Sequence, residues 1–106
     1  MKLSLRAGVL YVDNLKFCLA EAGNGRPNLP TGRFEVATQF AHAHRAVLPD
    51  ANGLGWLGAM PGCDVVLGSV RGRDGVIPSP SVVGRLVAVL EIAEGRGAPI
   101  WLEVVN

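Results

Sequence analysis

Residues 79–97 read SPSVVGRLVAVLEIAEGRG, and they carry the clearest secondary-structure signal in the chain. Ser79 is a good N-cap residue, and Pro80 fits the first helical position, where its missing N–H is not needed. Apolar side chains then follow at the i, i+3, i+4, i+7 spacing of one helical face. They are Val83, Leu86, Val87 and Leu90, with Val82, Val89 and Ala93 widening the stripe. Gly95 and Gly97 end the pattern, so the sequence predicts one amphipathic helix over residues 79–95.

The first twenty residues indicate strands. Residues 2–6 alternate polar and apolar side chains, which is typical of a half-buried strand. Residues 9–12 and 15–19 continue the extended pattern. Asp13 and Asn14 lie between them and tolerate positive φ, so a two-residue hairpin turn fits there. The sequence therefore predicts a three-stranded meander at the start of the chain.

Three further strands are expected outside this meander. Residues 33–40 return to a two-residue period, residues 63–68 form a short apolar run, and residues 100–105 follow the helix. Loops rich in glycine and proline over 21–31 and 49–62 separate these elements. This order predicts an α+β fold that is mainly β: a small curved sheet or barrel-like domain, with the helix over one face or mouth.

Length and composition limit the class of protein. A chain of 106 residues forms one domain, 1–106, and 49% hydrophobic against 18% charged residues excludes a disordered chain. The net charge of +1 removes the electrostatic case for a nucleic-acid or membrane partner. No apolar run reaches the roughly 20 residues of a membrane span, and the alternating N-terminus is unlike a signal peptide. With two cysteines only, we expect a cytoplasmic protein.

The glycine-rich stretch 53–58 matches G-x-G-x-x-G without the context of a dinucleotide site. That motif needs a strand before it and a helix that opens at the glycines, so that helix N–H groups meet the pyrophosphate. Here Asp50, Ala51 and Asn52 precede the glycines, and Pro61 follows. We expect no cofactor.

Two histidines and a cysteine define an alternative catalytic site. His42 and His44 share a face if their segment is extended, but no third metal ligand lies nearby in sequence, so we expect no metal site. Cys63 could act as a nucleophile with His42 or His44 as its base. Asp64 next to Cys63 disfavours the thiolate. Cys18 lies in an amphipathic strand, which indicates a structural thiol.

A binding surface is expected on the loop 50–61 and the neighbouring loop 71–74. Trp56 is a large aromatic residue in a glycine-rich loop, where it could either anchor a partner or pack back onto the domain as a lid. The expected binding residues are Asn52, Leu54, Trp56, Leu57, Arg71 and Arg73. The apolar residues would supply contact area and the arginines orientation. We expect a protein partner, with a homodimer through the same loop as an alternative.

Short motifs along nearly the whole chain resemble a small family of uncharacterised bacterial and phage proteins, loosely related to L,D-transpeptidase-like domains. The similar motifs are Phe17-Cys18-Leu19-Ala20-Glu21, Leu29-Pro30-Thr31-Gly32-Arg33-Phe34, Met60-Pro61-Gly62 with Val65-Val66-Leu67-Gly68-Ser69, and Gly75-Val76-Ile77. Residues 81–90 and 100–104 are similar to the family's closing helix and strand.

The resemblance also implies a loss of chemistry. The family's histidine falls near Val66 or Leu67, and its cysteine falls on Val76. Neither aliphatic side chain can act as a base or a nucleophile. The resemblance therefore implies a non-catalytic binding or accessory protein of phage or prophage origin. A divergent cysteine enzyme acting on a peptide or cell-wall substrate, and a structural component of a virion or secretion assembly, are the alternatives.

Overall fold

The computed structural model describes residues 1–23, 25, 28–41, 44–49, 56–60 and 62–105, and it describes their side chains except at 39–41 and 44–49. The strands are β1 (Lys2–Arg6), β2 (Val9–Val12), β3 (Leu15–Ala22), β4 (Gly32–Ala41), β5 (His44–Pro49), β6 (Leu57–Gly58), β7 (Val65–Gly68), β8 (Arg71–Gly72), β9 (Gly75–Val76) and β10 (Trp101–Val105). The helix is α1 (Pro80–Gly95).

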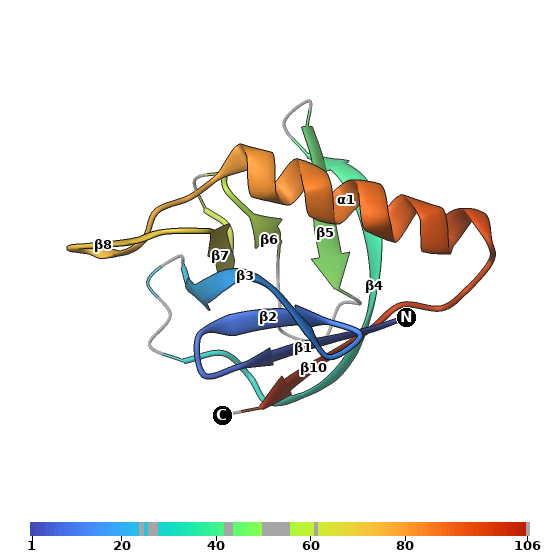
Figure 1. The fold of residues 1–106 in the computed structure, drawn as a ribbon, viewed down its shortest axis with the longest axis horizontal. Coiled ribbons are helices and arrows are strands. Elements are labelled where there is room, and N and C mark those ends of the chain that lie inside the picture. The colour runs from blue at the N-terminus through green and yellow to red at the C-terminus, as the bar shows by residue number, and fades with distance from the viewer. Residues whose placement is uncertain (24, 26–27, 42–43, 50–55, 61, 106) are drawn as a thin grey trace.

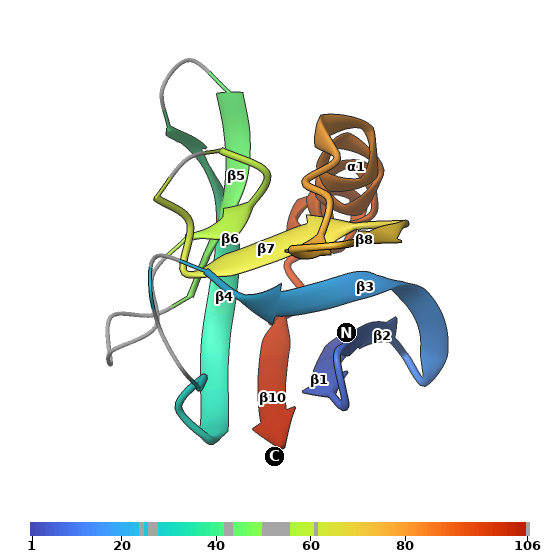
Figure 2. The ribbon, with the colours of Figure 1, turned by 90° about the vertical axis from the view of Figure 1, so that its left-hand side faces the viewer.

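Within the described residues, eight strands curl into a closed barrel in the order β1-β10-β4-β5-β6-β7-β3-β2 (Figures 1 and 2). β1 runs parallel to β10 and β6 runs parallel to β7, while the other neighbours are antiparallel. β8 and β9 form a separate two-stranded hairpin that projects from the barrel at the left of Figure 1. The expected α+β fold, mainly β and barrel-like with a late helix and a final strand, is confirmed.

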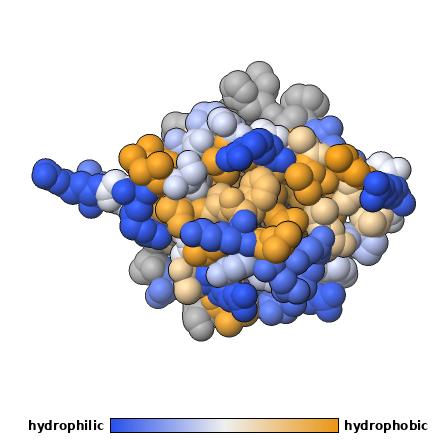
Figure 3. Space-filling model, in the orientation of Figure 1, coloured by the Kyte–Doolittle hydropathy of each residue, from blue (hydrophilic) through white to orange (hydrophobic). Residues whose placement is uncertain are grey.

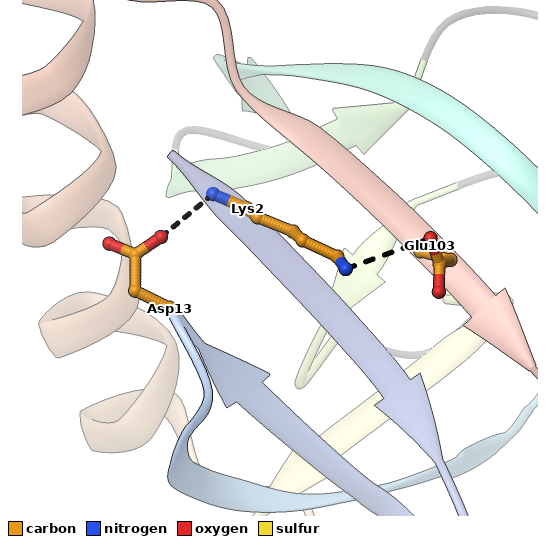
Figure 4. A network of polar contacts seen from close by, with 3 residues as sticks. All are labelled: Lys2, Asp13 and Glu103. Atoms are coloured by element: carbon orange, nitrogen blue, oxygen red, sulfur yellow. Dashed lines mark hydrogen bonds and ion pairs between the residues drawn. The ribbon is translucent and has the colours of Figure 1, made fainter.

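The predicted meander is formed by β1, β2 and β3. Asp13 and Asn14 have φ values of 48° and 70°, as a primed hairpin turn between β2 and β3 requires. The Asp13 carboxylate accepts a hydrogen bond from the Lys2 backbone N–H at 2.9 Å, and the Asp13 N–H donates to the Lys2 carbonyl at 2.8 Å. The Lys2 ammonium lies 3.8 Å from the Glu103 carboxylate on β10 (Figure 4). These contacts join the turn, β1 and β10 on the outer face of the barrel.

The helix forms where the sequence predicts it and completes the core. The Ser79 hydroxyl accepts a hydrogen bond from the Val82 N–H at 3.3 Å, which caps the first turn. Leu86 and Leu90 are completely buried, and α1 packs against β4, β5 and β7. The helix residues join the inward-facing barrel residues in one apolar cluster. Glu94 near the end of the helix accepts a hydrogen bond from the Thr38 hydroxyl on β4.

The sequence did not predict the strands β5 and β6 or the β8–β9 hairpin. β5 and the two-residue β6 fall in segments without a two-residue apolar period, and β6 lies inside the predicted loop 49–62. β6 is held by its neighbours, because Leu57 pairs with Val47 on one side and with Val65 on the other. The predicted loop 21–31 begins later than expected, since β3 continues to Ala22 along β7.

Candidate functional site

The predicted binding surface around Trp56 is only partly accessible. The interpretation of Leu57 as a binding residue is wrong, because its side chain is 0% exposed and belongs to the core. Trp56 is half-buried, and its carbonyl accepts hydrogen bonds from the N–H groups of Asp64 at 2.9 Å and Val65 at 3.2 Å. Its backbone is therefore fixed at the start of β7. Asn52 and Leu54 lie outside the described residues.

Arg71 and Arg73 are both exposed, as the sequence predicts, and they lie on the projecting β8–β9 hairpin. The tip of this hairpin is a hydrophilic projection at the left of Figure 3. Arg71 turns back toward the barrel, where its Nη2 atom would lie 3.1 Å from a Cβ placed on Gly8. The structure thus groups Arg71 with the β1–β2 turn.

The alternative pair of Cys63 with a histidine is not seen in the part of the chain that the structure describes. Val47 of β5 pairs with Leu57, and Leu57 pairs with Val65. The Cys63 sulfur lies beside Gly58 of β6, where a Cβ would be 3.2 Å from Sγ. His42 lies outside the described residues, and the His44 side chain is not described.

The environment of both thiols disfavours the thiolate. Cys63 is 3% exposed, and burial raises the pKa of its thiol. A hydrogen bond from the Met60 backbone lowers this pKa in part, and the Asp64 charge raises it further. Burial raises the pKa of Cys18 to about 11, and the Arg85 charge offsets only part of this effect. Both cysteines are unpaired. Among the described residues, no three His, Cys, Asp or Glu side chains gather as a metal site would need.

An open cavity of about 530 Å³ lies at the end of the barrel where β1, β3 and β10 finish. Its apolar lining includes Leu5, Ala20, Leu29 and Val104. Leu5, Ala20 and Val104 are inward-facing barrel residues, and Leu29 packs against the same core from the segment before β4. The cavity is therefore a continuation of the barrel interior that opens to solvent.

Glu21 and Arg71 add charge to the lining of this cavity. The Glu21 carboxylate accepts a hydrogen bond from the Val76 backbone N–H at 2.8 Å, and it lies 3.8 Å from the Arg71 guanidinium. One carboxylate on β3 thus contacts both strands of the β8–β9 hairpin. Gly75, with φ at 118°, leaves the space for it, since a Cβ there would lie 2.3 Å from Glu21 Oε1. These contacts fix the hairpin beside the cavity, which we call the mouth cavity.

Arg6 also contributes to the lining, but its guanidinium stacks on the Tyr11 ring at 4.4 Å from the centroid. Sequence reasoning selected Arg71 and missed Glu21, Gly8 and the apolar lining. The sequence signals were weak because Glu21 and Val76 are 55 positions apart. The meander places the ends of β1 and β3 on one side, and the parallel pairing of β1 with β10 adds the end of β10.

Comparisons with family models, with curated proteins and with solved structures found no match for the chain. In the part of the chain that the structure describes, no helix has both the length and the apolar character needed to cross a bilayer. The geometry of the mouth cavity is therefore the basis for a functional proposal.

Proposed function

We propose that the protein is a non-catalytic binding protein that receives part of a protein partner in the mouth cavity. The observation that supports this most directly is the cavity itself. Its volume of about 530 Å³ lies within the range of roughly 300–1,000 Å³ that is typical of ligand sites in proteins. It combines an apolar lining with a few charged groups, which is the usual composition of such sites.

The two kinds of lining residue have different roles in this proposal. Leu29 and Val105 are the partly exposed apolar residues of the lining, and a side chain of the partner would cover them, which supplies affinity. Arg71 and Glu21 are partly exposed at the edge, with side chains 52% and 32% accessible. Polar groups placed there orient a partner more than they hold it.

The divergent cysteine enzyme has less support. Cys63 is buried, and this burial raises the pKa of its thiol. A cytoplasmic setting agrees with two unpaired thiols. An accessory protein of a phage or prophage, as the sequence resemblance implies, is the biological role we propose. The homodimer and the virion or secretion component are further hypotheses.

Site-specific photocrosslinking tests the proposed site. A photoreactive residue at Val105, which lines the mouth cavity and is 46% exposed, should capture a defined partner in bacterial cells. The matched control carries the photoreactive residue at position 15 instead, because Leu15 is 75% exposed and does not line the cavity. Capture of the same partner from Leu15 or from Trp56, but not from Val105, would place the binding surface elsewhere. Loss of a measured turnover in Cys63→Ser, with folding intact, would instead support the enzyme.

A further inference from the structure

We infer that the mouth cavity recognises a carboxylate joined to an aliphatic group, as at the C-terminus of a peptide that ends in an apolar residue. This inference rests on the proposed function and names the chemistry of its ligand. It follows from the position of Arg71, from the charge at the mouth and from the apolar lining beside it.

Arg71 is held in place before any ligand arrives. Its backbone lies in β8, and Glu21 contacts both this guanidinium and the N–H of Val76 on the adjacent strand. Its guanidinium lies over the β1–β2 turn at Gly8, where the absence of a side chain leaves room for it. Gly8 has φ at 76°, so the turn itself also favours glycine. A cation fixed in this way loses little conformational freedom when it binds an anion.

Arg71 also keeps donor capacity for a ligand. A guanidinium carries five N–H donors in a planar fork, and this fork matches the two oxygens of a carboxylate. The distance of 3.8 Å to Glu21 is an ion-pair distance and too long for a hydrogen bond. The Oε1 atom of Glu21 accepts a hydrogen bond from the Val76 N–H. The Arg71 donors that face the mouth are therefore available to a second carboxylate.

The balance of charge favours a single negative charge. Arg6 and Arg71 line the cavity against Glu21, which leaves an excess of one positive charge. A monoanion neutralises this excess. A dianion such as a phosphate monoester would instead leave the lining with an excess of one negative charge. The partly exposed apolar lining at Leu29 and Val105 then favours an aliphatic group next to the carboxylate over a polar one.

Titrations followed by NMR test this inference with four probes. The probes are the acetylated peptide Ala-Ala-Leu with a free C-terminus, its C-terminal amide, octanoate and inorganic phosphate. The free-carboxylate peptide should shift the amide signals of Gly8 and Arg71. The amide should bind weaker by roughly tenfold or more, because it offers the guanidinium no charge. Saturable binding of octanoate without binding of the peptide would identify a free acid as the source of the carboxylate.

Arg71→Gln and Arg73→Gln provide the matched pair of variants. Both arginines are exposed on one hairpin, but only Arg71 lines the cavity. Arg71→Gln should weaken binding of the carboxylate by roughly tenfold or more and abolish the preference over the amide, whereas Arg73→Gln should retain both. Equal binding of acid and amide, equal effects of the two variants, or binding of neither carboxylate would overturn the inference. Photocrosslinking from Val105 with no carboxylate preference would overturn it while leaving the proposed function intact.

Discussion

Cys18 shows how burial of one residue affects the stability of the molecule. The thiol is 4% exposed, and desolvation raises its pKa from the usual 9.0 to about 11. The folded state therefore keeps the proton over a pH range in which the unfolded state releases it. By linkage, this contribution to stability is complete below pH 9 and is lost as the pH rises toward about 11. A difference of this size corresponds to roughly 2–3 kcal/mol.

Urea denaturation at pH 8, 9.5 and 10.5 measures this effect. We expect the free energy of unfolding to fall more steeply with pH in the parent than in Cys18→Ala. Cys63→Ala still contains the Cys18 thiol, so its free energy of unfolding should still show the fall with pH that Cys18 causes. The same slope in the parent and in Cys18→Ala would show that this thiol does not contribute.

Gly68 and Gly84 offer a second comparison of single residues. A Cβ on Gly68 would lie 2.0 Å from the Ile77 carbonyl oxygen, which is backbone and cannot move aside, whereas a Cβ on Gly84 meets nothing within 4 Å. Gly68→Ala should therefore displace Ile77, at the end of the hairpin, from β7 and lower the free energy of unfolding by about 1–3 kcal/mol. Gly84→Ala, in the exposed middle of α1, should raise it by up to about 1 kcal/mol. Thermal unfolding of both variants beside the parent checks the opposite signs.

The apolar stripe predicted for α1 can be tested by comparing substitutions of its buried and exposed residues. Leu86 and Leu90 are completely buried, while Ile92 on the same helix is 59% exposed. Leu86→Ala or Leu90→Ala should each lower the free energy of unfolding by about 2–5 kcal/mol, because each leaves a cavity in the core. Ile92→Ala is the matched control and should change it by less than about 0.5 kcal/mol. Denaturation midpoints that move equally in all three variants would contradict this packing.

The elements that could be predicted are those whose own residues determine them. The β2–β3 turn has Asp13 and Asn14, and α1 has Ser79, Pro80 and a complete apolar stripe. β6 could not be predicted in this way, because its two residues form a strand only between β5 and β7. Leu57 was assigned to the surface for the same reason. Its glycine-rich neighbours indicate a loop, while strand pairing on both sides buries it in the core.

The candidate site depends on the whole molecule. Arg71 was predicted from its exposure in a polar loop, but its placement requires Glu21 from β3 and the turn at Gly8. The mouth cavity requires the parallel pairing of β1 with β10, since the ends of these strands lie on one side of the barrel. This pairing joins the first strand to the last, and no local pattern in either strand specifies it. The sequence therefore supports single residues of the site, and barrel closure assembles them.

Barrel closure also predicts how the molecule unfolds. Every barrel strand is paired on both sides within the described residues, and α1 shares one apolar cluster with the strands. Loss of any one strand would expose two edges and open the common core, so no part should unfold alone, as two-state behaviour requires. Trp56 next to β6 and Trp101 in β10 report on separate parts of the ring. In Trp101→Phe and Trp56→Phe, the remaining tryptophan and the far-UV circular dichroism should give one urea midpoint within each variant. A Trp56 signal that changes well before the circular dichroism would mean that β5 and β6 open separately, and that the ring is not one cooperative unit.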